Sequence, residues 1–140
     1  MQVVSPVTGQ DIWMTPGGGM EAGESDQQSL EREVWEETGL RLTESGRLVW
    51  IRNFSFQLNN GVFKQFEKFF LVFTPQFKPT MQNNPAQDEL DIFKRYKWWN
   101  IDQLIGAADT FAPAHLGPHL VTLMKDAPQQ PLDISTSENN

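Results

Sequence analysis

The sequence predicts a single domain with a mixed α/β fold. Short strands come first, a helix follows them, and a long hairpin and a C-terminal helix complete the order of elements. That order is typical of helices packed on either side of a mixed sheet. The 140 residues, of which 39% are hydrophobic, are enough for one sizeable core. We expect the domain to span residues 1–127 and the polar, proline-containing residues 128–140 to be disordered.

Two short strands and a helix form the N-terminal part. Residues 1–5 are a very short apolar start, and residues 12–14 form a second short strand. After a glycine loop, a helix is predicted over residues 26–38. Ser25 followed by Gln28 is a capping box, which fixes the start of this helix.

The predicted helix carries an apolar stripe. Leu30, Val34 and Thr38 recur at i,i+4, so we expect them to be buried against the sheet. Gly39 fits the left-handed residue that follows the last turn of a helix. Sequence signals therefore bound the helix at both ends.

A long β-hairpin is predicted next. Residues 47–58 are rich in β-branched and aromatic side chains and form its first strand. Asn60 and Gly61 mark a tight turn, and residues 62–73 form the returning strand. Residues 74–88 contain prolines at three positions and are predicted to be a loop.

Three short elements are expected in the C-terminal part. Residues 94–99 form a short strand, and Asn100 or Asp102 can cap a helix that runs to about Ala107. Residues 117–126 form the last predicted helix. The proline near its start does not exclude a helix, since proline is tolerated in the first turn.

Three glutamates crowd one face of the first helix. At about 100° per residue, Glu33, Glu36 and Glu37 fall within roughly a 100° arc beside the apolar stripe, so they should line the rim of a cleft. Like charges at this spacing and near the negative end of the helix dipole are unfavourable, although Arg32 can brace Glu36. A segment that breaks two local rules suggests a functional site. Hard divalent cations are the simplest compensation, and a solvated acidic face is the alternative.

The bulk composition narrows the classes of partner. A net charge of −7 and a pI of about 4.7 argue against long nucleic acids. The absence of cysteine removes disulfides and thiolate chemistry. Without a signal peptide or an apolar run of about 18 residues, we expect a cytoplasmic protein that does not bind membranes. His115 and His119 have metal-compatible spacing but lack a third ligand nearby, which favours surface histidines.

Residues 17–40 match the signature of a known family. The pattern Gx5Ex7REUxEExGU, in which U is aliphatic, belongs to the Nudix hydrolases, and the chain resembles this MutT-like family at every specified position. The likeness runs loosely to about Leu104. The chain is also similar to a bacterial subfamily with TPGGG before the box, within Trp13–Gly19, and QxExFFLV after it, at Gln65–Val72. The specified positions of the box are Gly18, Glu24, Arg32, Glu33, Val34, Glu36, Glu37, Gly39 and Leu40.

The resemblance implies a Nudix α/β/α sandwich with a mixed sheet. Its first strand is unusually short here, and a truncated N-terminus is one explanation for this. A missing strand would leave a sheet edge that can pair with a second copy of the chain. The implied reaction is hydrolysis of a pyrophosphate bond in a nucleoside diphosphate linked to a group X, with Mg²⁺ or Mn²⁺ as cofactor. The implied metal ligands are Glu33, Glu36, Glu37 and the carbonyl of Gly17. The implied catalytic residues are Glu37, Glu36, Glu89 and Arg32.

The other implied roles concern the loop, the general base and the substrate. Gly18 and Gly19 let the backbone approach phosphate, while Glu24 and Gly39 are structural parts of the box. The general base is left open between Glu37 and a later loop acid, Glu89 or its neighbour Asp88. The candidate substrate contacts outside the box are Phe54, Gln65, Glu67 and Trp98, for which core packing or a solvent-facing hairpin is the alternative.

The group X is not fixed by the box. The proline of ADP-ribose hydrolases and the tyrosine of dinucleoside polyphosphate hydrolases are replaced here by Ser55 and Phe56. Nucleoside triphosphates of the 8-oxo-dGTP type, or nucleotide sugars, are favoured, and a small phosphorylated substrate is the expected partner. A non-catalytic nucleotide sensor and an RNA-end pyrophosphohydrolase are the alternatives.

Overall fold

The structure, a computed structural model, describes residues 1–58, 61–126 and 128–135. Helices and strands are mixed along these ranges, so the predicted α/β class is confirmed. The first strand, β1 (Gln2–Val4), is short, as expected. Within the described ranges, no helix is long and apolar enough to cross a membrane.

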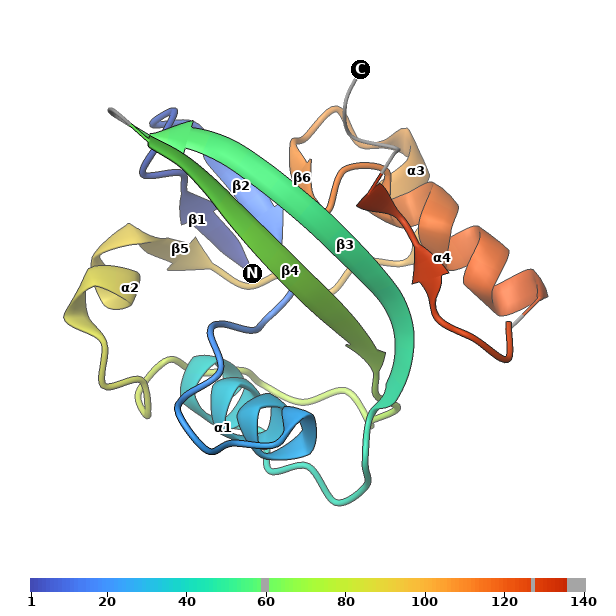
Figure 1. Cartoon of the computed structure of the whole chain (residues 1–140), viewed down its shortest axis with the longest axis horizontal. Coiled ribbons are helices and arrows are strands. Elements are labelled where there is room, and N and C mark those ends of the chain that lie inside the picture. The colour runs from blue at the N-terminus through green and yellow to red at the C-terminus, as the bar shows by residue number, and fades with distance from the viewer. Residues whose placement is uncertain (59–60, 127, 136–140) are drawn as a thin grey trace. The chain divides into compact units, whose positions relative to one another are not determined.

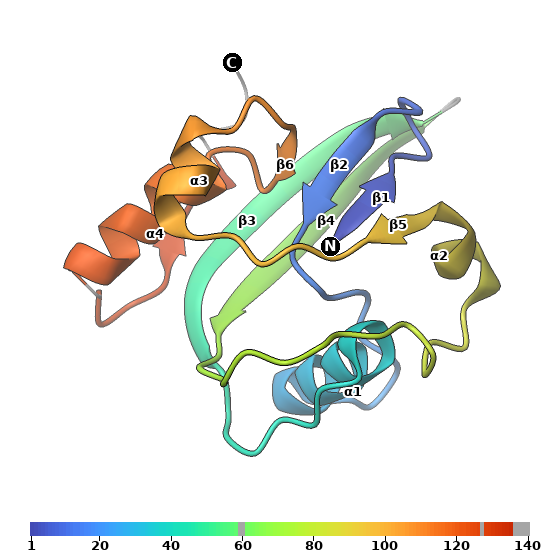
Figure 2. The same cartoon turned by 180° about the vertical axis from the view of Figure 1, so that it is seen from behind.

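The chain divides into two compact units, and the first comprises Met1–Gly46 and Val72–Trp98. In this unit β1 pairs antiparallel with both β2 (Asp11–Met14) and β5 (Phe93–Arg95), so it lies between them (Figure 2). Val3 and Trp13 are buried there. This small sheet shares the unit with the helices α1 (Asp26–Thr38) and α2 (Gln87–Ile92).

Both ends of α1 are as the sequence predicts. The Ser25 side chain accepts a hydrogen bond from the Gln28 N–H, and the Gln28 side chain accepts one from the Ser25 N–H, which is the predicted capping box. Gly39 ends the helix in the left-handed region with φ 74°, and its N–H donates to the Trp35 carbonyl.

Replacing Gly39 by alanine is expected to lower the free energy of unfolding by about 1–2 kcal/mol from the left-handed φ alone. A further loss is expected because an added Cβ would lie 2.8 Å from Thr80 Cγ2. Gly9→Ala is the control, since Gly9 has φ 71° and no atom within 4 Å of an added Cβ. Urea unfolding should show the larger loss for Gly39→Ala; equal losses would mean that Thr80 gives way.

The second unit comprises Arg47–Leu71 and Trp99–Asn140. Figure 1 shows β3 (Arg47–Leu58) and β4 (Gly61–Leu71) as a long curved hairpin, which is the predicted one. The predicted turn falls partly on residues 59 and 60, which lie outside the described residues.

The expected disorder of residues 128–140 is wrong for residues 128–135. β7 (Leu132–Asp133) pairs in parallel with β3, so the sheet order is β4-β3-β7. Ile134 is only 5% exposed and belongs to the core of this unit with Val49, Trp50 and Leu123. The composition of the segment is polar, but one apolar side chain and a few strand hydrogen bonds are enough to order it. Residues 136–140 lie outside the described residues.

The remaining elements were predicted less completely. The helices α3 (Ile101–Gly106), capped by Asn100, and α4 (Leu116–Lys125) match the two expected ones. The helix α2 and the strand β6 (Phe111–Ala112) were not predicted, and β5 is shorter than expected. Elements of two to six residues carry little periodicity. The helix α2 also lacks a side-chain cap of the kind that marked α3, and β6 has two residues only.

Candidate functional site

The most buried face of α1 is acidic, which corrects the predicted orientation of the helix. Glu33 is 7% exposed and Glu37 is 4% exposed. Leu30 and Val34 of the predicted apolar stripe are only partly buried, and Thr38 is the stripe residue that is buried. The glutamates therefore do not line a rim beside the buried face, because Glu33 and Glu37 form it. Apolar periodicity could not predict this, since the helix buries carboxylates against polar backbone.

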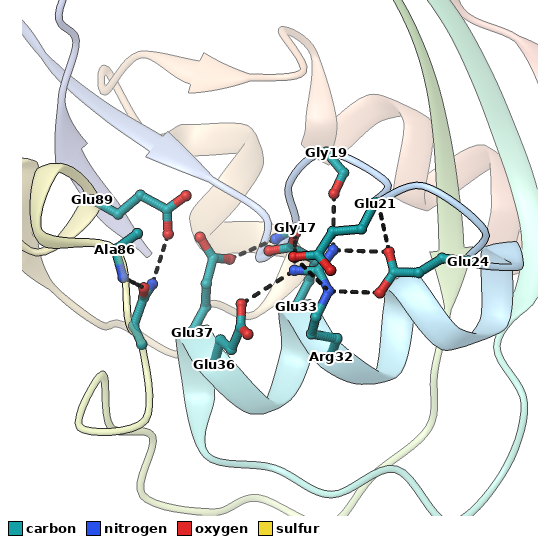
Figure 3. A network of polar contacts seen from close by, with 11 residues as sticks. Gly17, Gly19, Glu21, Glu24, Arg32, Glu33, Glu36, Glu37, Ala86 and Glu89 are labelled. Carbon is teal, nitrogen blue, oxygen red and sulfur yellow. Dashed lines mark hydrogen bonds and ion pairs between the residues drawn. The ribbon is translucent and has the colours of Figure 1, made fainter.

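Arg32 lies at the centre of a network of carboxylates (Figure 3). Its Nε and one terminal nitrogen donate to the two Glu24 carboxylate oxygens, at 2.7 and 3.0 Å. Its other terminal nitrogen donates to Glu33 at 2.8 Å and to Glu36 at 3.2 Å. The terminal nitrogen that donates to Glu24 also donates to the Gly19 carbonyl, at 2.9 Å. One cation thus joins the glycine loop to the acidic helix.

The charge pairing is strongest between Arg32 and Glu24. The Arg32 hydrogen bond lowers the pKa of Glu24 to about 2, and the Glu24 hydrogen bond raises the pKa of Arg32. Burial raises the pKa of Glu33, although Arg32 partly offsets this. The pair Arg32–Glu24 therefore keeps its charges over the whole physiological pH range.

Glu37 is held by backbone. The Gly17 N–H donates to its carboxylate at 2.6 Å, and the Tyr96 hydroxyl donates to its backbone carbonyl (Figure 3 shows the first of these). Burial raises the pKa of Glu37 to about 7, and the nearby charges of Glu33 and Glu89 add to the rise. The rise has two causes that act together, namely removal of the carboxylate from water and the proximity of like charges.

The glycine loop packs directly against the acidic face. A Cβ added to Gly18 would lie 2.6 and 2.7 Å from the two Glu33 carboxylate oxygens, whereas one added to Gly19 would meet nothing within 4 Å. Gly17 has φ 147°, a conformation that side chains rarely adopt. The glycines at 17 and 18 are therefore required by backbone conformation and by the approach of Glu33.

Glu89, the candidate base from the later loop, lies in the same unit as the box. It stands on α2, and its carboxylate accepts a hydrogen bond from the Asn84 amide at 2.7 Å. Its charge acts on both Glu33 and Glu37. Asp88, the suggested substitute, is exposed. The buried Asn84 was not singled out by sequence, and no motif marks it.

The predicted substrate residues on the hairpin share one part of the second unit. Phe54 and Gln65 are Cα partners across β3 and β4, and Arg52 and Glu67 are the next partners on the same face. The Arg52 Nε donates to Glu67 at 2.6 Å, and its guanidinium carbon lies 4.8 Å from the Phe54 ring centroid. Arg52 is 6% exposed and was missed from the sequence, although the hairpin register pairs it with Glu67.

The remaining aromatic and histidine positions have structural contacts. Trp98 is 47% exposed, meets Phe77 edge to face, and donates its indole N–H to the Phe77 carbonyl at 3.1 Å. His115 is exposed, as expected of a surface histidine, and it precedes α4 at the N-cap position without a side-chain hydrogen bond to the helix. The ring of His119 instead packs on Trp50, with 5.7 Å between ring centroids.

The residues of the acidic face fit a hard divalent cation by their chemistry. Glu33, Glu36 and Glu37 offer carboxylate oxygens, the ligand type that Mg²⁺ and Mn²⁺ prefer. Burial of Glu37 with a raised pKa leaves a charge that a cation would compensate. In the described ranges no three acids or histidines are grouped closely enough to hold a metal. Arg32 donates hydrogen bonds to Glu33 and Glu36, and the Gly17 N–H donates one to Glu37.

Comparison with known proteins gives a family match and distant relatives. The model of the NUDIX domain matches residues 4–119. Diphosphoinositol polyphosphate phosphohydrolase 2 of Mus musculus is 26% identical over 105 residues, which cover 75% of this chain and 52% of the relative. The Homo sapiens protein of the same name gives the same values. Diphosphoinositol polyphosphate phosphohydrolase 3-alpha of Mus musculus is 29% identical over 105 residues, covering 75% and 57%.

This chain therefore spans little more than half the length of those curated relatives. No solved structure matches it significantly. The family match includes the glycine loop, α1, the hairpin, α2 and Trp98, and thus every predicted site residue.

Proposed function

Because this chain belongs to the Nudix family, we propose that it is a pyrophosphohydrolase of a nucleoside diphosphate linked to a group X, dependent on Mg²⁺ or Mn²⁺. The observation that carries the proposal is the pair of buried glutamates, Glu33 and Glu37, on α1 against the glycine loop. A buried acidic pair destabilises a fold unless a ligand uses it. We further propose that residues 1–127 belong to one Nudix domain, which continues to residue 135 because Ile134 is part of the core of the second unit.

The chain's own residues divide the work as follows. Glu33, Glu36 and Glu37 would hold the metal together with the Gly17 carbonyl, and Arg32 with Glu24 fixes the helix to the loop. When bound, the divalent ion neutralises charge that develops on the pyrophosphate oxygens. Gly18 and Gly19 leave room for the substrate phosphates to approach the backbone.

Glu89 is proposed as the general base that accepts the proton of the attacking water. The three box glutamates are assigned to the metal, so a fourth acid is needed for the proton. Glu89 is partly exposed and electrostatically coupled to Glu33 and Glu37, which supports this assignment. Glu37 is the alternative base, and Glu89→Gln with full activity would favour it.

Nucleoside triphosphates and nucleotide sugars are proposed as the substrates. Phe54, whose ring already has the Arg52 guanidinium over it, and Trp98, which is 47% exposed, are proposed to stack on a base. Gln65 and Glu67 are proposed to contact a sugar or base edge. The relatives' names point to diphosphoinositol polyphosphates as the alternative. That substrate is far more anionic, and the present chain has 11 Lys and Arg against 18 Asp and Glu.

A hydrolysis screen tests the proposal. It should measure phosphate and pyrophosphate release from dGTP, 8-oxo-dGTP, GDP-mannose, ADP-ribose, a capped RNA end and a diphosphoinositol polyphosphate, with Mg²⁺ or Mn²⁺ and with EDTA. We expect metal-dependent turnover of at least one nucleotide. Binding of a nucleotide without turnover of any compound would instead support a nucleotide sensor.

Gly18→Ala is expected to lower kcat/KM by about 10–100-fold, the range seen when the support of a metal ligand is disturbed. The reason is that the new methyl group would push the Glu33 carboxylate, which lies less than 3 Å from it. Gly106→Ala is the control, since Gly106 lies outside the proposed site and its added Cβ would meet nothing within 4 Å. Mn²⁺ binding followed by electron paramagnetic resonance should weaken in the first variant only. Equal losses in both variants would contradict this role of Gly18.

A further inference from the structure

We propose that Asn84 is a positioning residue that holds the Glu89 carboxylate in place for proton transfer. The inference rests on the proposed function, because Glu89 acts there as the general base. Asn84 lies in the loop before α2, outside the signature box and outside every motif identified in the sequence.

Both ends of the Asn84 amide are used. Its Nδ2 donates to Glu89 Oε2 at 2.7 Å, and its Oδ1 accepts from the Ala86 N–H at 2.8 Å. Asn84 is 7% exposed, so water competes little for these bonds. The backbone adds a third anchor, because the Asn84 N–H donates to the Met81 carbonyl at 3.0 Å. The side chain is therefore a fixed bridge and not a mobile surface amide.

The bridge is needed because α2 is a weak support. The helix has six residues, and its N-cap, Ala86, offers no side-chain hydrogen bond. Helices this short are not stable by themselves. Asn84 Oδ1 ties down the Ala86 N–H at the start of α2, and Asn84 Nδ2 ties down Glu89 one turn later. The start of α2 and the Glu89 carboxylate are thus both held by the single side-chain amide of Asn84.

The orientation also opposes an electrostatic repulsion. Glu89 carries the same charge as Glu33 and Glu37, which lie near enough for their charges to interact. An unrestrained side chain would turn away from them. Asn84 gives the one hydrogen bond that the Glu89 carboxylate accepts within the described chain, and the bond involves one oxygen only. The second oxygen is left to take a proton.

The hydrogen-bond bridge is tested by measuring kcat and KM of Asn84 variants. The substrate is the one that the hydrolysis screen shows to be turned over fastest. Asn84→Asp keeps an acceptor for Ala86 but replaces the donor by a charge that repels Glu89. We expect kcat to fall about 10-fold or more, part of what a general base contributes, while KM and Mn²⁺ affinity change less than about twofold. Asn84→Ala removes both bonds and should show the same split. Gln82→Glu, an added charge on an exposed residue of the same loop, is the control.

A double variant separates positioning from general damage. If Asn84 acts through Glu89, Asn84→Asp combined with Glu89→Gln should be no slower than Glu89→Gln alone. Additive losses, or equal changes in kcat and KM, would overturn the proposal. The contact itself is tested without activity by the ¹⁵N–¹H signals of the Asn84 amide, which should move in Glu89→Ala. Unmoved signals would also overturn it, whereas inactivity of the wild type on every compound refutes only the proposed function.

Discussion

Glu37→Gln is expected to lower metal-dependent hydrolysis by about 10²–10⁴-fold while the protein stays folded. Glutamine keeps the size of the side chain and an oxygen that can accept from the Gly17 N–H, which lies 2.6 Å from the carboxylate. It removes the negative charge through which the carboxylate would attract a divalent ion. Glu36→Gln should behave alike, although its side chain is held by Arg32 and is less buried.

Steady-state kinetics with Mg²⁺ and circular dichroism are the measurements for these variants. The matched control is Glu31→Gln, the same substitution on the exposed side of α1, where Glu31 accepts a hydrogen bond from Gln27. It should keep full activity. If Glu36→Gln and Glu37→Gln also kept full activity, the assignment of the acidic face to the metal would be wrong.

The helix and its box could be read from the sequence because their signals are local. The capping box at Ser25 and the left-handed Gly39 depend on residues a few positions apart, and both are present as predicted. The hairpin is long enough for its composition to identify both strands. The fixed spacing of the signature box made the family recognisable from residues 18–40.

The burial of the acidic residues of α1 could not be predicted, because it depends on residues from distant segments whose positions the sequence does not reveal. Glu33 and Glu37 are buried because a glycine loop and the segment before Trp98 provide donors such as the Gly17 N–H and the Tyr96 hydroxyl around α1. An apolar-periodicity argument assigns the buried face to Leu30 and Val34 instead. The bridge from Asn84 to Glu89 spans a turn that no pattern marks. Burial of polar side chains of this kind results from tertiary contacts, which secondary-structure propensities do not describe.

The metal-free wild type is expected to lose stability as the pH rises from about 5 to about 8. Burial raises the pKa of Glu37 from 4.5 in the unfolded chain to about 7 in the folded one. Between these values the folded state binds more protons than the unfolded state, so the free energy of unfolding falls as the pH rises. The difference between 7 and 4.5 corresponds to a loss of roughly 3 kcal/mol, complete above pH 7. The raised pKa of Glu33 acts in the same direction.

Glu37→Gln should remove most of this pH dependence, which makes the inactive variant more stable than the wild type at pH 8 in EDTA. Adding Mg²⁺ at about 1,000 times its Kd should reverse the order, since a ligand at that concentration stabilises the folded state by about 4.1 kcal/mol. Urea unfolding at pH 5 and pH 8, with EDTA or Mg²⁺, measures both effects, and Glu31→Gln should follow the wild type. Identical slopes with pH for the wild type and Glu37→Gln would show that Glu37 titrates normally. The stability difference between the wild type and Glu37→Gln is thus expected to have opposite signs with EDTA and with Mg²⁺. Such a reversal would show that the buried Glu37 carboxylate destabilises the metal-free fold and stabilises the metal-bound one.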